Sequence, residues 1–215
     1  MRIKGLTGIE WIAMERIKRI KRNSGFTLIE LLVVIAIIGV IASLIVYMAG
    51  QASDKARRAR VETMKAQIMA AIEAYHARHG FFPPDNPIDP SVNQLYYELT
   101  GTVYNNGNYK DIEGDAADPK VFNAGGFVNS SQPPDKPQNF LQSASRIEYR
   151  KVNNAKVLAV PYDWPAGRTN PIPTAPGVNP WRYVSTKPIH NPNSYDLWAE
   201  LVVGDKVILI SNWGK

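Results

Sequence analysis

An uncharged run of twenty residues, 31–50, constrains this chain more than any other feature. It reads LLVVIAIIGVIASLIVYMAG. A helix rises about 1.5 Å per residue, so the run reaches roughly 30 Å, the thickness of the hydrocarbon core of a bilayer. A buried core helix is the alternative, but such a helix is rarely apolar on all sides over this length. The run therefore predicts a helix that crosses a membrane.

The charge of the chain is concentrated before this run. Residues 1–25 carry seven basic and two acidic side chains, a net charge of +5, whereas the whole chain carries +6. A basic segment beside an apolar span predicts a cytoplasmic N-terminus and a C-terminal domain on the other side of the membrane. Because the remaining residues carry only about +1, the high isoelectric point does not indicate a nucleic-acid partner.

The junction between the two segments excludes an ordinary secretory signal, whose apolar region is shorter and ends at a small-residue cleavage site. Here Gly25 follows the basic stretch, Phe26 comes next, and a single carboxylate, Glu30, lies four residues further on. A carboxylate within an apolar span costs about 3 kcal/mol on insertion scales, so it is functional by default and needs a partner. The alternative is that Glu30 only reaches the cytoplasmic interface.

The run GFTLIE at residues 25–30 resembles the cleavage and methylation motif of type IV prepilins and type II secretion pseudopilins. The resemblance implies that a membrane-embedded peptidase cuts after Gly25 and then methylates the new amine of Phe26. It also implies that Glu30 pairs with the N-terminal amine of a neighbouring subunit. Such a pair in a low-dielectric environment could set the axial register of a filament.

The span itself has the composition of a helix that packs against copies of itself. Gly39 and Ser43 lie four residues apart, at the small-residue spacing that lets helix backbones approach closely. Gly39 could equally mark a point where the helix loosens in a filament.

The leader could begin at either of two methionines. Met14 opens a twelve-residue basic leader, and the preceding residues are either a misassigned start or a true extension.

The helical pattern continues beyond the membrane. Apolar residues recur at three- and four-residue steps and form one stripe: Met64, Ile68, Ala71, Ile72 and Tyr75. Gly80 ends the pattern, and Pro83 and Pro84 prevent it from resuming. We therefore expect one helix over residues 27–79, apolar in its first half and amphipathic in its second.

The C-terminal part predicts an antiparallel sheet. Residues 181–185, 195–202 and 206–210 are rich in β-branched and aromatic side chains, and Gly204 and Asp205 supply a turn. One face of this sheet would cover the apolar stripe, which gives a pilin-like α+β fold. Four stretches resemble G-type pseudopilins: AIEAYHARHGFFPPD at the helix end, NPWRY at 179–183, SYDLW at 194–198 and the final NW at 212–213.

The expected organisation has five parts. Residues 1–25 form the removed leader, 26–50 the transmembrane assembly helix, 51–80 its amphipathic continuation, 81–180 a loop-rich variable region and 181–215 the sheet. Within the variable region we expect a helix at 91–99 and strands near 146–152 and 156–160. This region is longer than a G-type pseudopilin requires, and it could be a partner-binding surface or a simple insertion.

No enzymatic or cofactor chemistry is expected. The sequence contains no cysteine, no phosphate-binding glycine loop and no nucleophile elbow. G-type pseudopilins bind calcium between their last strands, but residues 200–206 offer only two carboxylates beside a lysine, whereas calcium prefers six to eight oxygens. Calcium is therefore poorly supported. The helical trio Glu73, His76 and His79 cannot converge easily on one metal.

These features predict a structural subunit of a periplasmic pseudopilus in a type II secretion-like system, anchored in the inner membrane. The implied partners are copies of itself in a helical filament, other pseudopilins, the prepilin peptidase and methyltransferase, the inner-membrane platform and the assembly ATPase. The alternatives are a type IV pilus subunit for adhesion, motility or DNA uptake, and a monomeric membrane-anchored binding protein.

Overall fold

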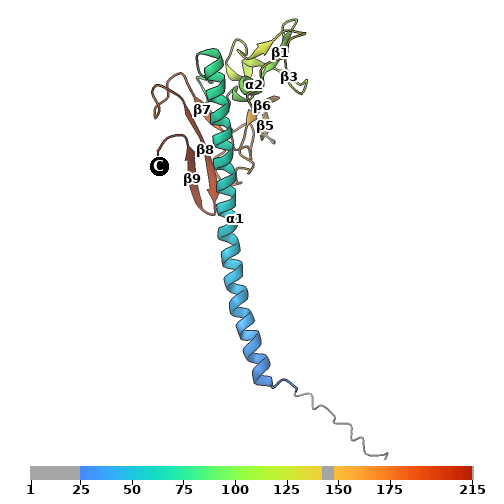
Figure 1. Ribbon diagram of the computed structural model, residues 1–215, viewed down its shortest axis with the longest axis vertical. Helices are drawn as coiled ribbons and strands as arrows, with labels where there is room; N and C mark the ends of the chain where they lie inside the picture. Colours follow the sequence, from blue (N-terminus) through green and yellow to red (C-terminus); the bar gives the residue numbers. More distant parts are fainter. Residues whose placement is uncertain (1–24, 142–147, 215) are drawn as a thin grey trace, which may run out of the picture. The chain divides into compact units, whose positions relative to one another are not determined.

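The computed structural model describes residues 25–141 and 148–214, and for residues 46–51 it describes the backbone alone. The chain divides into two compact units, Met1–Ala49 and Gly50–Lys215. Nearly all of the expected leader lies outside the described residues, so its start at Met1 or Met14 stays a prediction. Figure 1 shows the order of the elements along the chain.

One helix, α1 (Leu28–His79), covers 52 residues and confirms the expected helix to within one residue. Its end has a clear local cause. Gly80 adopts a φ of 81°, a left-handed conformation that favours glycine, and its N–H donates to the His76 carbonyl over 2.8 Å. This bond caps the last turn, and the two prolines that follow prevent further helix.

In the first unit, α1 presents an apolar surface that no other described residue covers. The segment Leu28–Ile45 has a mean hydropathy of 3.0, and none of it is buried. By length and composition it could cross a membrane. Lipid or other protein chains would remove such a surface from water.

In the second unit, α1 buries one stripe against the core. Four of the five expected stripe residues are buried, and Met64 is half-buried against the same core. Val61, one turn nearer the N-terminus, is also buried and extends the stripe beyond the prediction. The five buried residues, from Val61 to Tyr75, are separated by seven, three, one and three positions. This spacing keeps their side chains on one helical face.

The C-terminal sheet consists of β7 (Arg182–Val184), β8 (Asp196–Val203) and β9 (Lys206–Ser211), antiparallel and in that order. The three expected strands are confirmed with small changes in their bounds. Gly204 has a φ of 57° in the β8–β9 turn. Inward side chains of the sheet belong to the same hydrophobic core as the α1 stripe, and Lys65 Nζ donates to the Ser211 carbonyl over 2.8 Å. Figure 1 shows this sheet alongside the second half of α1.

The region expected to be loop-rich contains more regular structure than the sequence indicated. The expected helix begins four residues late, as α2 (Leu95–Thr100), and all its residues are buried. A mixed sheet of order β3-β2-β1-β4 was not predicted. Its strands are β1 (Thr102–Asn105), β2 (Asn108–Asp111), β3 (Ala116–Ala117) and β4 (Ser130–Ser131), and the short helix η1 (Pro119–Phe122) follows β3.

The two expected strands near residues 146–152 and 156–160 form a hairpin, β5 (Tyr149–Val152) and β6 (Ala155–Leu158). Residues 146 and 147 lie outside the described part of the chain. Asn153 and Asn154 both have positive φ, of 48° and 64°, in the turn. Two such residues in succession give the twist that matches a two-residue hairpin, and asparagine tolerates this conformation well.

The second unit thus combines helix and sheet around one core. Leu158 accepts a backbone hydrogen bond from Trp181, which joins β6 to the entry of β7. Buried aromatic side chains from α2 and η1 lie in the same hydrophobic cluster as Tyr183 of β7 and Tyr195, which precedes β8. The fold is α+β, consistent with a pilin-like protein.

Candidate functional site

The start of α1 is organised by a reciprocal pair of hydrogen bonds. Thr27 is the residue before the helix, and Glu30 is its third helical residue. The Thr27 N–H and the Thr27 hydroxyl each donate to Glu30 Oε2 over 2.8 Å, and the Glu30 N–H donates to Thr27 Oγ1 over 3.3 Å. This arrangement is a capping box, which satisfies backbone donors that a helix start leaves without partners.

The capping box shows that Glu30 has partners within its own chain. The signal for this cap, T-x-x-E directly before an apolar run, is present in the sequence, but the role expected of Glu30 did not include it. Glu30 therefore has two roles to separate: it stabilises the helix start through hydrogen bonds, and it holds a negative charge beside the residue that the motif exposes as an N-terminus.

The other expected site residues of this segment are all exposed. Gly25 precedes the helix, and the Phe26 side chain is 81% exposed. Gly39 and Ser43 lie on neighbouring turns of α1, with open space around the position of a Cβ on Gly39. The Ser43 hydroxyl donates to the Val40 carbonyl over 2.7 Å, so it is satisfied within the helix. The resulting surface is smooth, apolar and open to close helix contact.

Comparison with known proteins identifies the class of this segment. Residues 20–46 match the family described as the prokaryotic N-terminal methylation motif. The match includes the junction at Gly25, the capping box and the pair Gly39 and Ser43, and it indicates a type IV pilin-like protein. Such a motif implies processing by a prepilin peptidase and assembly into a pilus-like system. No curated protein and no solved structure matches the chain.

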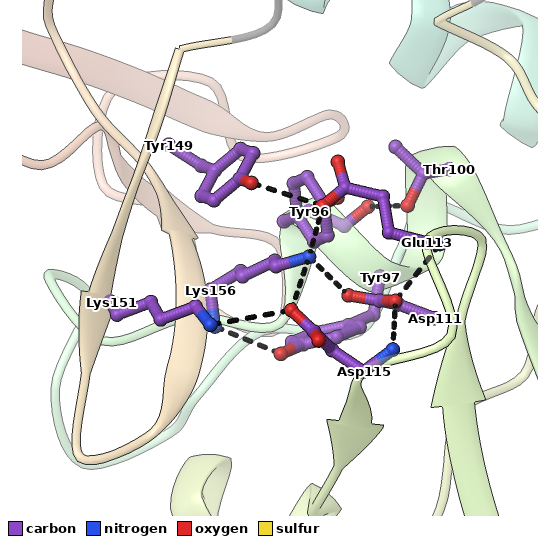
Figure 2. A network of polar contacts seen from close by, with 9 residues as sticks. All are labelled: Tyr96, Tyr97, Thr100, Asp111, Glu113, Asp115, Tyr149, Lys151 and Lys156. Carbon is purple, nitrogen blue, oxygen red and sulfur yellow. Dashed lines mark hydrogen bonds and ion pairs between the residues drawn. The ribbon is translucent and has the colours of Figure 1, made fainter.

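A second candidate site, in the second unit, is a buried ionic centre around Lys156. The Lys156 ammonium lies 2.6 Å from Asp111 Oδ2, 2.7 Å from Glu113 Oε2 and 3.0 Å from Asp115 Oδ2. The side chains of Lys156 and Asp111 are 1% and 0% exposed, whereas those of the other two acids are about half exposed. Figure 2 shows the three carboxylates converging on the lysine.

Two hairpins and a helix contribute the residues of this centre. Lys156 comes from β6, Asp111 ends β2, and the other two acids lie in the loop before β3. The rings of Tyr96 and Tyr149 lie 5.6 Å and 4.9 Å from the Lys156 nitrogen and form cation–π contacts with it. From α2, the Tyr97 hydroxyl accepts the backbone N–H of Lys156 over 2.8 Å.

The electrostatics of the centre are those of a compensated buried charge. Burial alone would lower the pKa of Lys156, but the three carboxylates raise it well above its ordinary value. Conversely, hydrogen bonding from Lys156 lowers the pKa values of Glu113 and Asp115. At neutral pH the centre is therefore one ammonium surrounded by carboxylates. Lys156 supplies the positive charge that a dissolved cation would otherwise have to supply.

Of the two carboxylates expected near the last turn, Glu200 has a protein partner. It pairs with Arg182 over 3.3 Å. His76 stacks on Phe82, away from His79, whose ring lies 4.3 Å from that of Tyr75. Within residues 25–141 and 148–214, no three His, Asp or Glu residues lie together in a way that could hold a metal ion.

Another carboxylate, Glu98 of α2, is buried without a cation. Its oxygens accept hydrogen bonds from the Tyr75 hydroxyl over 3.0 Å and from the backbone N–H groups of Val128 and Asn129 over 3.0 Å and 2.9 Å. Burial raises the pKa of Glu98, and these donors offset the rise only in part. The residue ties α1 and α2 to the segment before β4.

The stretches that resemble G-type pseudopilins meet at the start of β8. Asp196 accepts backbone hydrogen bonds from Ile189, His190 and Asn191. Burial would raise the pKa of Asp196, but these donors lower it below its ordinary value. Next to it, Asn212 accepts the Leu197 N–H over 2.9 Å and donates to the Tyr195 carbonyl over 2.8 Å, which anchors the end of the described chain.

Proposed function

We propose that this chain is a structural subunit of a pseudopilus in a type II secretion-like system. The observation that carries the proposal is the first half of α1. It is apolar on every side and uncovered from Leu28 to Ile45, and its start carries one carboxylate within the matched methylation motif. A segment of this kind suits a subunit that is stored in a membrane and later packed among copies of itself.

The proposed cycle begins with insertion, with the N-terminus in the cytoplasm. The prepilin peptidase cuts between Gly25 and Phe26 and methylates the Phe26 amine. Glu30 then exchanges its contacts with Thr27 for the charged amine of a neighbouring subunit. In a low-dielectric environment an ionic contact is stronger than a neutral hydrogen bond, so this exchange favours the docked state.

The hydrogen bonds that Asp196 and Asn212 form at the start of β8 support a pseudopilin rather than a surface pilin. Asp196 accepts hydrogen bonds from the preceding loop, and Asn212 bonds to Leu197 and Tyr195, so two of the four stretches that resemble G-type pseudopilins are in contact. A type IV pilus subunit remains the second candidate, because it shares the methylation motif. A monomeric anchored binding protein is less favoured, since a simple tether has no use for a peptidase junction or a carboxylate in its span.

Processing is tested by mass spectrometry of the protein from its native host. We expect a mature chain that begins with N-methylated Phe26. Gly25→Val should block cleavage and leave the precursor in the membrane, because the peptidase reads the small residue at the junction. A wild-type chain that keeps its leader in cells with an active peptidase would contradict the proposal.

Deletion of the gene in the host separates the two filament functions. A pseudopilin deletion should abolish release of folded proteins across the outer membrane and leave surface pili intact. Loss of surface fibres with normal secretion would assign the chain to a type IV pilus instead. Loss of neither, together with a monomeric chain on in vivo cross-linking, would favour the anchored binding protein.

A further inference from the structure

The ionic centre places an amine against a carboxyl group in a site that excludes water on one side. Lys156 Nζ lies 2.6 Å from Asp111 Oδ2, and both side chains are almost completely buried. Rings of two tyrosines cover the nitrogen. Well-oriented groups react with effective molarities of about 10⁵–10⁸ M, so amide formation that fails between free molecules can proceed within a folded chain.

The two oxygens of Asp111 have different surroundings. Oδ1 accepts the backbone N–H groups of Glu113 and Asp115, over 3.0 Å and 2.9 Å. Two fixed N–H donors on one oxygen form an oxyanion hole for a tetrahedral intermediate at Cγ. Oδ2 faces the ammonium and accepts no backbone N–H within the described residues. This oxygen is therefore the one free to leave.

Glu113 supplies the remaining requirement, a group that moves protons. Its Oε2 lies 2.7 Å from Lys156 Nζ and 3.1 Å from the Tyr149 hydroxyl. The side chain is about half exposed, so it can exchange protons with solvent and leave a path for a released water molecule. A base within hydrogen-bond reach of the attacking nitrogen is what general acid–base catalysis requires.

We propose that Lys156 and Asp111 form an intramolecular amide bond after folding, with Glu113 as the proton carrier. One proton passes from Nζ to Oδ2 within the ion pair, and the neutral amine then attacks Cγ. Glu113 takes a second proton from the nitrogen and delivers it to Oδ2. The C–N bond is formed, the Cγ–Oδ2 bond breaks, and one water molecule leaves. The third proton remains on the amide nitrogen, so charge and atoms balance without an oxidant.

The resting pair is ionic, because the surrounding carboxylates hold the proton on Lys156. Attack must therefore wait for proton transfer, which makes the reaction slow compared with folding. The result would be a covalent link between the end of β2 and the middle of β6, across two hairpins. A chain without cysteines has no disulfide with which to make such a link in an exported domain.

Peptide mapping of the full chain in detergent tests the proposal directly. After complete trypsin digestion, the linked protein should yield one branched peptide that joins residues 111–120 to residues 152–168, lighter by one water than their sum. Trypsin cannot cut after a Lys156 whose amine is acylated. Samples taken over several days after purification should show the branched peptide accumulating. Its absence at every time, with free Lys156 throughout, would overturn the proposal.

Three variants identify the groups involved. Lys156→Arg keeps the cation in the cluster but should give no branched peptide. Asp111→Asn should release ammonia in place of water and give a branched peptide of the same mass as the wild type. Glu113→Gln should slow the reaction by about 100-fold or more. Equal rates for Glu113→Gln and wild type would overturn the assignment of Glu113 as the proton carrier.

Discussion

Glu30 combines two interactions that substitutions can separate. In the single chain its carboxylate closes the capping box with Thr27, and in the proposed filament it holds the amine of a neighbour. Glutamine can also serve at this position of a capping box but carries no charge. Leucine can do neither. The pair of variants therefore distinguishes stabilisation of the helix start from attraction between subunits.

We expect Glu30→Gln and Glu30→Leu both to insert, to be cut at Gly25 and to accumulate in the membrane with little filament. Glu30→Leu should in addition weaken the helix start, by about 1 kcal/mol as for the loss of a cap. Thr27→Ala is the matched control, because it weakens the capping box and keeps the charge, so it should still assemble. The measurement is the filament fraction after shearing, in cells without the wild-type copy. Normal assembly of Glu30→Gln would contradict the pairing.

Glu98 makes stability depend on pH in the opposite direction from Asp196. Its pKa is raised by burial, so the folded state binds a proton more tightly than the unfolded state. The contribution of Glu98 is therefore fully present below its unfolded pKa and is lost as pH rises through the folded value. Asp196, whose pKa is lowered, loses its contribution as pH falls. The Glu98 effect therefore acts above the ordinary pKa of a carboxyl group, and the Asp196 effect acts below it.

Chemical denaturation of the wild type should show stability falling as pH rises above the ordinary pKa of glutamate, with a slope of at most about 1.4 kcal/mol per pH unit. Glu98→Gln should flatten this slope, since it removes the titrating group and keeps the side-chain size. Asp196→Asn is the control, because it should alter only the acid limb. A slope unchanged in Glu98→Gln would show that another group causes the dependence.

At the scale of elements, α1 serves two environments with one continuous backbone. Its first half has no face packed against other described residues, whereas its second half buries the stripe from Val61 to Tyr75. A substitution in the first half can therefore leave folding of the second unit untouched and still change contact between subunits. Gly39 is the most informative position, since the space around it is open.

Gly39→Leu should insert, be cut and fold as the wild type does, because Gly39 is exposed and a Cβ at this position meets nothing within 4 Å among the described residues. In a filament it would separate helices that approach closely at this point, so we expect a filament fraction reduced at least about tenfold. Ile41→Leu is the control, because residue 41 lies about 200° further around the helix. Filament formation by Gly39→Leu at the wild-type level would show that close packing does not occur there.

At the scale of the whole molecule, the second unit contains its own core and its own cation. Because Lys156 fills the centre formed by the carboxylates, the exported part should not require calcium. A fragment that begins at Ser53 should be soluble and folded, and a chelator should change its melting temperature by less than about 2 °C. A large fall with chelator, restored by calcium, would show that carboxylates outside this centre bind the ion. Lys156→Met is the matched variant, and it should lose stability with or without calcium.

The features predicted correctly from the sequence were those encoded by local periodicity. The stripe of α1 and the three C-terminal strands repeat over several turns or residues, so short windows were sufficient. Strands β3 and β4 were missed because they have two residues each, and β4 pairs with β1 through a distant contact, Thr102 with Ser130. The hairpin of β1 and β2 was local and readable, because Asn106 and Gly107 form its two-residue turn. The ionic centre was missed because Lys156 lies 45 positions beyond Asp111, and only the fold brings them together. The capping box is also local and could have been predicted, but Glu30 was interpreted only as a charged residue in an apolar span.

The continuity of α1 at Gly50 has a consequence for how tension enters the second unit. A pull along the axis of the helix reaches the core at Val61 and is shared by all side chains as far as Tyr75. If α1 slid along its axis against the sheet, the hydrogen bond from Lys65 to the Ser211 carbonyl would also be strained. These contacts must yield together rather than one after another, so the unit should resist extension from its N-terminal side better than peeling of β9 from the edge of its sheet.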